Sequence, residues 1–183
     1  MYALIDDVER AANAGAFRSA LALALTIPDI GGHLAYPELT STGERYRRWF
    51  DEYVKEYYPV EELQKALGIG WFDAQACYKL RCAYLHSGNS ALADVNYIST
   101  LDFVIQKGEN IYSGDKGAAR IDIRTNRVFY THVRLNIAKL CAALCAAGKY
   151  FCSNYKGNMS LEAFDIKIYD ANEELPDPED ING

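Results

Sequence analysis

The chain has 183 residues, half of them hydrophobic and 13% aromatic, which excludes a disordered chain and fits one domain with a sizeable core. No segment approaches the roughly 18 uninterrupted apolar residues that a membrane span needs. The N-terminus, MYALIDDVER, lacks the basic start and apolar stretch of a secretory signal. We therefore expect a cytoplasmic protein without membrane association.

The formal charge of −6 is concentrated at one end of the chain. Eight acids and one base lie in residues 162–183, which gives that segment −7 and leaves residues 1–161 with +1. A nearly neutral body does not repel phosphates as a uniformly acidic protein would. We interpret residues 1–161 as a single domain and residues 162–183 as an acidic C-terminal tail. The tail is either a solvated, frayed terminus or a segment that folds back over a basic surface.

The first part of the chain is predicted to be helical. Apolar residues recur at helical spacing over residues 2–26, and Pro28 is expected to end that helix and begin a loop. The loop ends at Ser41-Thr42-Gly43-Glu44, which matches a capping box. A short helix is expected to follow Pro59 and close at Gly68. A second helix is predicted between the capping box and Pro59. Its broad apolar stripe at helical spacing is made of Tyr46, Trp49, Phe50, Tyr53, Val54 and Tyr57.

The next helix is predicted from its two ends. Asp73 is a good N-cap, and the helix is expected to reach about Leu85, with Gly88 and Asn89 as the stop signal.

A change of pattern follows. Residues 101–130 contain β-branched and aromatic runs separated by turn signals, which predicts a small antiparallel β meander. An amphipathic helix then runs from Val133 to about Phe151. The predicted fold class is therefore mainly α with a small antiparallel meander (α+β), inserted before the last long helix.

The cysteines indicate free thiols rather than a disulfide framework or a metal site. Their number, five, is odd, and the chain has no CxxC pair. Cys141 and Cys145 lie four residues apart in an Ala-rich helix, where we expect them to be buried as small hydrophobic residues. The three histidines, His33, His86 and His132, fall in separate segments, so we expect no metal ion and no cofactor.

Arg81 and His86, in the segment RCAYLHSGN, are the candidate chemical pair. Arg81 lies at the edge of the apolar face of its helix, and an ideal helix places His86 about 140° away, so the two side chains diverge. They converge only if the helix ends or unwinds at His86, which Ser87-Gly88-Asn89 favours. Alternatively, the Arg and His of one chain meet those of a second copy across a symmetric contact.

The Arg81–His86 spacing at the end of a late helix resembles the R-x(4–6)-H motif of the HEPN superfamily. The wider chain resembles a group of uncharacterised bacterial HEPN-like proteins through ALALTIPDIGG, GERYRRWFDEYV, YKLRCAYLHSGN and FYTHVRLNIAKLC, which together cover most of the chain to about residue 150. Where the family often has a polar residue, commonly Asn, after the Arg, this chain has Cys82. The resemblance implies a helical bundle that usually dimerises and, in active members, a metal-independent ribonuclease of defence or toxin–antitoxin systems.

Residue roles follow from this resemblance. His86 would act as the general base, since only His titrates near neutrality without perturbation. Arg81 would stay charged and bind phosphate, and the products would carry 2′,3′-cyclic phosphate ends. Asp29, Tyr84 and Asn89 are expected to support the pair, Asp29 either as the partner that orients Arg81 or as a cap in its own loop. The implied partners are RNA, a second copy of the chain and a possible cognate antitoxin.

Other interpretations stay open. One is a non-catalytic HEPN-like module that binds a nucleotide or a protein partner; Arg81 would then be a buried arginine bonded to a carboxylate such as Asp29, and His86 would cap the helix end. Another is a structural helical domain that assembles through its aromatic stripe. Four arginines make the region of the predicted meander locally basic: Arg120, Arg124, Arg127 and Arg134. This basic region is either an RNA-facing surface or an ordinary solvated face.

Overall fold

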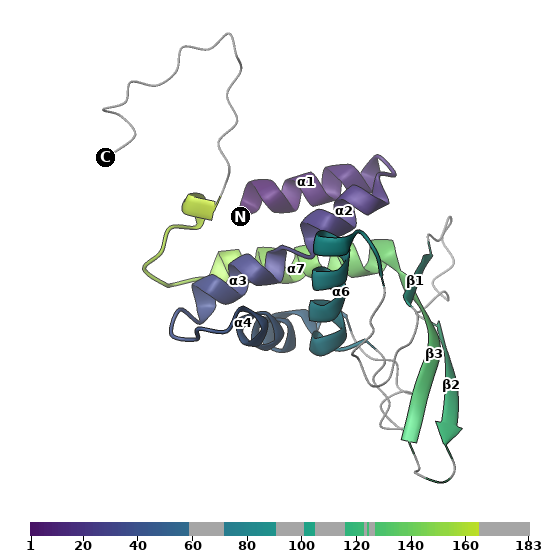
Figure 1. Cartoon of the computed structure of the whole chain (residues 1–183). Helices are drawn as coiled ribbons and strands as arrows, with labels where there is room; N and C mark the ends of the chain where they lie inside the picture. The colour runs from purple at the N-terminus through teal and green to yellow at the C-terminus, as the bar shows by residue number, and fades with distance from the viewer. Residues whose placement is uncertain (59–71, 91–100, 105–115, 123, 125–126, 165–183) are drawn as a thin grey trace.

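The computed structural model of the chain describes residues 1–58, 72–90, 101–104, 116–122, 124 and 127–164 (Figure 1). Helices predominate among these residues, which confirms the prediction of a mainly helical protein. Within the same ranges, none of the helices combines the length and the apolarity needed to traverse a bilayer. The helices are α1 (Tyr2–Asn13), α2 (Phe17–Ala24), α3 (Ile27–Ala35), α4 (Thr42–Trp49), the π-helix η1 (Phe50–Val54), α6 (Ala74–Ser87), α7 (Ile137–Asn154) and the 3-10 helix η2 (Leu161–Phe164).

The single helix predicted over residues 2–26 is two helices, α1 and α2. The chain turns between them at Gly15, whose φ of 76° is the left-handed conformation that glycine adopts most readily. The prediction that Pro28 begins a loop is wrong, because Pro28 lies in the first turn of α3. The N–H groups of a first turn have no intrahelical partner, so a proline there loses no hydrogen bond.

Helix α4 begins where the sequence predicts. Ser41 is its N-cap, and the Ser41 hydroxyl accepts a hydrogen bond from the Glu44 N–H at 3.3 Å. The helix then widens into η1, where the Lys55 N–H donates to the Phe50 carbonyl oxygen, five residues back, at 3.3 Å. The aromatic stripe is largely buried against the rest of the chain, and assembly through it stays a prediction. Its buried members are Tyr46, Trp49, Phe50 and Val54, whereas Tyr57 is exposed.

Helix α7 is the central element of the core. It packs against α1, α2, α3 and η1, and Figure 1 shows it running through the middle of the helical part. The predicted start at Val133 is wrong, because the preceding strand continues to Asn136, which then caps α7 by accepting the Lys139 N–H at 3.1 Å. Cys141 and Cys145 are buried in this helix, as predicted.

The described strands form one sheet with the order β1-β3-β2. These strands are β1 (Leu101–Val104), β2 (Lys116–Asp122) and β3 (Arg127–Asn136). β2 and β3 pair antiparallel, with an irregularity in register between Ala118 and Ala119. β1, however, pairs with β3 in parallel, so the sheet is not the antiparallel meander predicted. Figure 1 shows the sheet beyond the N-terminal end of α7, into which β3 leads directly.

Three predictions lie outside the residues that the structure describes. They are the short helix between Pro59 and Gly68, the acidic tail beyond residue 164, and the orientation of Arg120, Arg127 and Arg134.

Helix α4 holds α3 on one side and α6 on another. Against α6, the Tyr46 hydroxyl lies 3.3 Å from the Cys77 sulfur, and the Tyr46 and Tyr78 rings pack with centroids 5.4 Å apart. A Cβ on Gly32 would lie 2.8 Å from the Arg45 backbone oxygen, so α3 and α4 cross closely. Helix α4 therefore holds α3 and α6 in one packed unit.

Candidate active site

Helix α6 carries both members of the candidate pair and is defined by capping at both ends. The Asp73 carboxylate accepts a first-turn N–H at 2.8 Å, as predicted for an N-cap. Gly88 adopts a φ of 64° at the C-terminal end, and the Asn89 N–H donates back to the last turn at 3.4 Å, as in a Schellman motif. Arg81 therefore lies in the middle of the helix, and His86 lies in its last turn.

The Arg81 guanidinium contacts Asp29 and His86 within one chain. Its Nε donates to Asp29 Oδ2 at 2.7 Å, and its Nη1 lies 3.1 Å from His86 Nε2. The side chains of Arg81 and Asp29 are only 21% and 18% exposed, whereas His86 is exposed. Asp29 was expected either to orient Arg81 or to cap its own loop. In the structure it is the partner of Arg81.

The expected divergence of Arg81 and His86 is wrong. Helix α6 neither ends nor unwinds before Ser87, yet the two side chains meet. The angle of about 140° describes where the side chains leave an ideal helix, and the long arginine side chain turns its guanidinium back to the histidine. One copy of the chain is therefore sufficient to form the pair.

The charges of Asp29 and Arg81 are set by burial and by each other. Burial raises the pKa of Asp29 above its ordinary value and outweighs the hydrogen bond and charge of Arg81, which lower it. The charges of Arg45 and His86 also lower the Asp29 pKa. Burial alone would lower the pKa of Arg81, but the hydrogen bond and charge of Asp29 raise it, so the guanidinium stays charged. Asp29 Oδ1 is buried without a hydrogen-bond partner among the described residues.

The contact between Arg81 and His86 restricts the direction of a hydrogen bond between them. All five guanidinium hydrogens are donors, so a hydrogen bond here requires His86 Nε2 to accept. A neutral imidazole with a lone pair on Nε2 is able to take a proton from a substrate hydroxyl once a phosphate oxygen replaces it at Arg81 Nη1, while Arg81 Nε stays on Asp29.

The residues around the pair come from three helices. The Tyr84 hydroxyl donates to the Arg18 carbonyl oxygen on α2 at 3.3 Å, so Tyr84 fastens α6 to α2 rather than pointing at His86. Asn89 is exposed and contributes its backbone N–H to the helix cap. Cys82, which follows Arg81, hydrogen-bonds to Arg81 and contributes to raising its pKa. Burial raises the pKa of Tyr78, and a hydrogen bond with Cys82 raises it further.

Arg45 affects the charge of the site, and no sequence pattern connected it with the site. It lies on α4, and its charge helps to lower the pKa of Asp29, after burial and Arg81. Its Nη1 donates to the Leu39 carbonyl oxygen at 3.2 Å, which holds the side chain along α4. The signal available in the sequence is its position one residue before the buried Tyr46, which places it on the border of the apolar stripe.

In the ranges that the structure describes, no three His, Cys, Asp or Glu side chains gather as metal ligands would. Comparisons of the chain with family models, curated proteins and solved structures find no match.

Proposed function

We propose that the chain is a metal-independent endoribonuclease of the HEPN type, with RNA as its substrate. The observation that carries this proposal is the contact of Arg81 with the exposed His86 at the end of α6. A cation that binds phosphate beside a neutral imidazole is the minimum that metal-free RNA cleavage needs.

The proposed reaction uses both side chains. His86 Nε2 takes the proton of the ribose 2′-hydroxyl, and the 2′-oxygen attacks the adjacent phosphorus. The bond to the 5′-oxygen of the next nucleotide breaks, and that oxygen takes a proton from water. The hydroxide left behind takes the proton from His86, which restores the base. The products are a 2′,3′-cyclic phosphate and a 5′-hydroxyl. Arg81 stabilises the charge that develops on the phosphate oxygens.

Asp29 supports this role by holding the Arg81 guanidinium through Nε. At the end of the guanidinium, Nη1 reaches the exposed His86. A fixed guanidinium needs less reorganisation to bind two phosphate oxygens than a free one. Asp29 is therefore a positioning residue in this proposal, and it does not contact the substrate.

The proposal includes the biological setting that the HEPN resemblance implies, a bacterial defence or toxin–antitoxin system with a cognate antitoxin as partner. A homodimer also stays a prediction. The pair forms within one chain, so a dimer would serve to widen the RNA surface rather than to assemble the pair. Light scattering at high protein concentration tests this prediction, and a monomer alone would contradict it.

An RNA cleavage assay with EDTA present tests the activity. We expect the natural protein to cleave a structured RNA and leave cyclic phosphate ends. We expect His86→Ala to lose about 10²–10⁴ in rate, as loss of one acid–base group usually costs. His33→Ala is the matched control, because His33 lies at the other end of α3 from Asp29 and packs edge-on against Phe164.

Two results would contradict the proposal. One is the absence of cleavage with every RNA class offered; the other is cleavage that survives in His86→Ala. Either result would favour the non-catalytic binding module, in which the Arg81–Asp29 ion pair has a structural role.

A further inference from the structure

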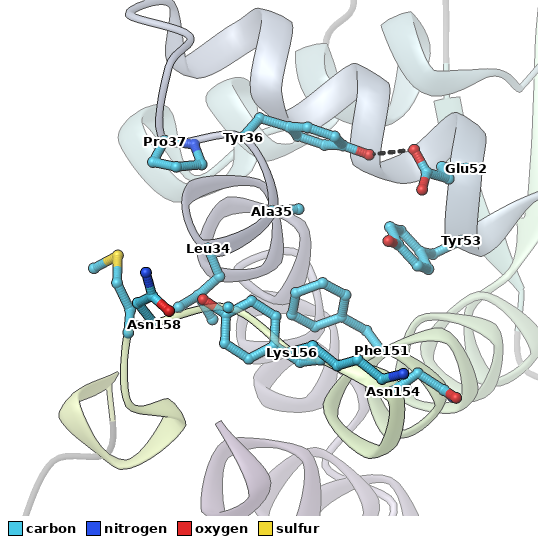
Figure 2. A pocket seen from close by; sticks show the side chains of 13 residues that line it. Leu34, Ala35, Tyr36, Pro37, Glu52, Tyr53, Phe151, Asn154, Lys156 and Asn158 are labelled. Atoms are coloured by element: carbon cyan, nitrogen blue, oxygen red, sulfur yellow. Dashed lines mark hydrogen bonds between the residues drawn. The ribbon is translucent and has the colours of Figure 1, made fainter.

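A second candidate site lies at the opposite end of α3 from Asp29. It is a cavity of about 620 Å³ bordered by the C-terminal ends of α3 and α7 and by η1 (Figure 2). This volume is in the range of small-molecule sites. In Figure 2, Tyr36 and Glu52 lie on one side of the cavity, and Phe151, Asn154 and Lys156 lie on the other. No residue of the Arg81 site borders it.

Four aromatic rings form much of the cavity wall: Tyr36, Tyr53, Phe151 and Tyr155. Tyr53 and Phe151 meet edge to face, with centroids 5.2 Å apart and planes at 79°, and Phe151 and Tyr155 lie 5.3 Å apart. Aromatic faces are electron-rich and attract cations. The Tyr36 ring already has one such contact, since the Arg48 guanidinium lies 4.3 Å from its centroid.

The polar features of the cavity are also suited to a positive ligand. The Tyr36 hydroxyl donates to Glu52 Oε2 at 2.5 Å, which directs the carboxylate along the cavity wall (Figure 2). Burial, together with the hydrogen bond to Glu52, raises the pKa of Tyr53 to about 12, so this hydroxyl stays neutral. Helices α3 and α7 both end at the cavity, and a helix C-terminus carries a partial negative charge.

We propose that this cavity binds a small organic cation with N–H donors, an alkylammonium or guanidinium group. The cation would lie among the aromatic rings and donate to the Glu52 carboxylate. Among the described residues that line the cavity, Lys156 is the one cation, and its ammonium opposes such a ligand. Lys156 therefore provides a test of the charge of the ligand. Removal of Lys156 should strengthen binding of a cation and weaken binding of an anion.

The experiment is a calorimetric titration of the full chain with agmatine, which carries both an ammonium and a guanidinium group. Choline, which has no N–H donor on its ammonium, and adenosine monophosphate, which is anionic, are the comparison ligands. We expect saturable agmatine binding and weaker choline binding. Lys156→Met should tighten agmatine binding two- to fivefold, roughly the effect of one partly exposed charge.

Two further variants assign the binding to the cavity. Glu52→Gln and Tyr53→Leu should each weaken agmatine binding about two- to fivefold, through loss of the charge and of one aromatic face. Asp51→Asn is the matched control, because Asp51 is the neighbouring acid on η1, is paired with Lys55 at the surface and does not border the cavity. Its affinity for agmatine should be unchanged.

Three outcomes would overturn the proposal. The first is the absence of saturable agmatine binding up to about 10 mM, because even weak specific binding is detected at lower ligand concentrations. The second is an equal effect of Glu52→Gln and Asp51→Asn, which would indicate general surface charge. The third is preferred binding of adenosine monophosphate that weakens in Lys156→Met, which would make this an anion site. The result is independent of ribonuclease activity, since His86→Ala should bind agmatine as the natural protein does.

Discussion

Removal of Arg81 should destabilise the protein much more than removal of His86, although both variants should lose cleavage. Arg81→Ala leaves the Asp29 carboxylate without the partner that is 2.7 Å away, in a place where its side chain is only 18% exposed. Breaking a fully buried pair costs about 3–5 kcal/mol. Because each of these side chains is about a fifth exposed, we expect a smaller loss of about 2–3 kcal/mol in the free energy of unfolding.

Thermal unfolding measures this difference. For a chain of this length, 1 kcal/mol corresponds to roughly 2–4 °C, so Arg81→Ala should lower the Tm by roughly 4–12 °C. His86→Ala should change the free energy by no more than about 0.5 kcal/mol, because His86 is exposed in the last turn of α6. Arg10→Ala is the matched control, since the Arg10–Asp7 pair has the same 2.7 Å separation but side chains that are 75% and 53% exposed.

The cost of Arg81→Ala should also depend on pH. Burial already raises the pKa of Asp29 above its ordinary 3.8, and the substitution removes the largest influences that lower it. A carboxyl with a higher pKa in the folded than in the unfolded protein loses stability as the pH rises through the folded value. The difference in unfolding free energy between the natural protein and Arg81→Ala should therefore be full at neutral pH and shrink as the pH falls toward 3.8. An equal loss at both pH values, or no loss at all, would refute this account of the ion pair.

Three further predictions concern packing, capping and the thiols. A Cβ on Gly31 would overlap the Trp49 indole, so Gly31→Ala should cost about 1–3 kcal/mol in urea unfolding, and a stability equal to that of the natural protein would mean that α3 and α4 separate easily. Asp73→Ala should cost about 1 kcal/mol by loss of the α6 cap, and calorimetry should show a Tm lower by a few degrees. Thiol titration of the denatured, unreduced protein should find all five cysteines, and a reproducible missing pair would contradict this expectation. In the native protein Cys82 should react first, because the other four are buried and burial raises the pKa of Cys77, Cys141 and Cys145 to about 12.

The features of the fold that could be predicted are those encoded over a few neighbouring residues. The caps at Ser41 and Asp73 and the helix stop at Gly88 depend on side chains and backbone within one helical turn, and all three were predicted. The break at Gly15 was missed because the apolar periodicity continues across it. The parallel pairing of β1 with β3 was missed because strand direction depends on residues 32 positions apart.

The sequence predicted which residues form the candidate site better than it predicted how they are arranged. Arg81 and His86 were recognised from their spacing, and Asp29 was named as one possible partner of Arg81. The meeting of Arg81 and His86 in one chain could not be derived from helix angles, because these ignore the reach of a long side chain. The influence of Arg45 on the pKa of Asp29 depends on the close crossing of α3 and α4, and no short pattern in either helix indicates that crossing.

The central position of α7 has a consequence for the newly made chain. Helices α1, α2 and α3 pack against α7, which begins only at Ile137. A ribosome that adds roughly 5–20 residues per second would leave their apolar faces without this partner for roughly 5–20 s. A nascent chain arrested before residue 137 is therefore expected to be cut rapidly by protease and held by chaperones. One arrested after α7 has emerged from the exit tunnel should resist both.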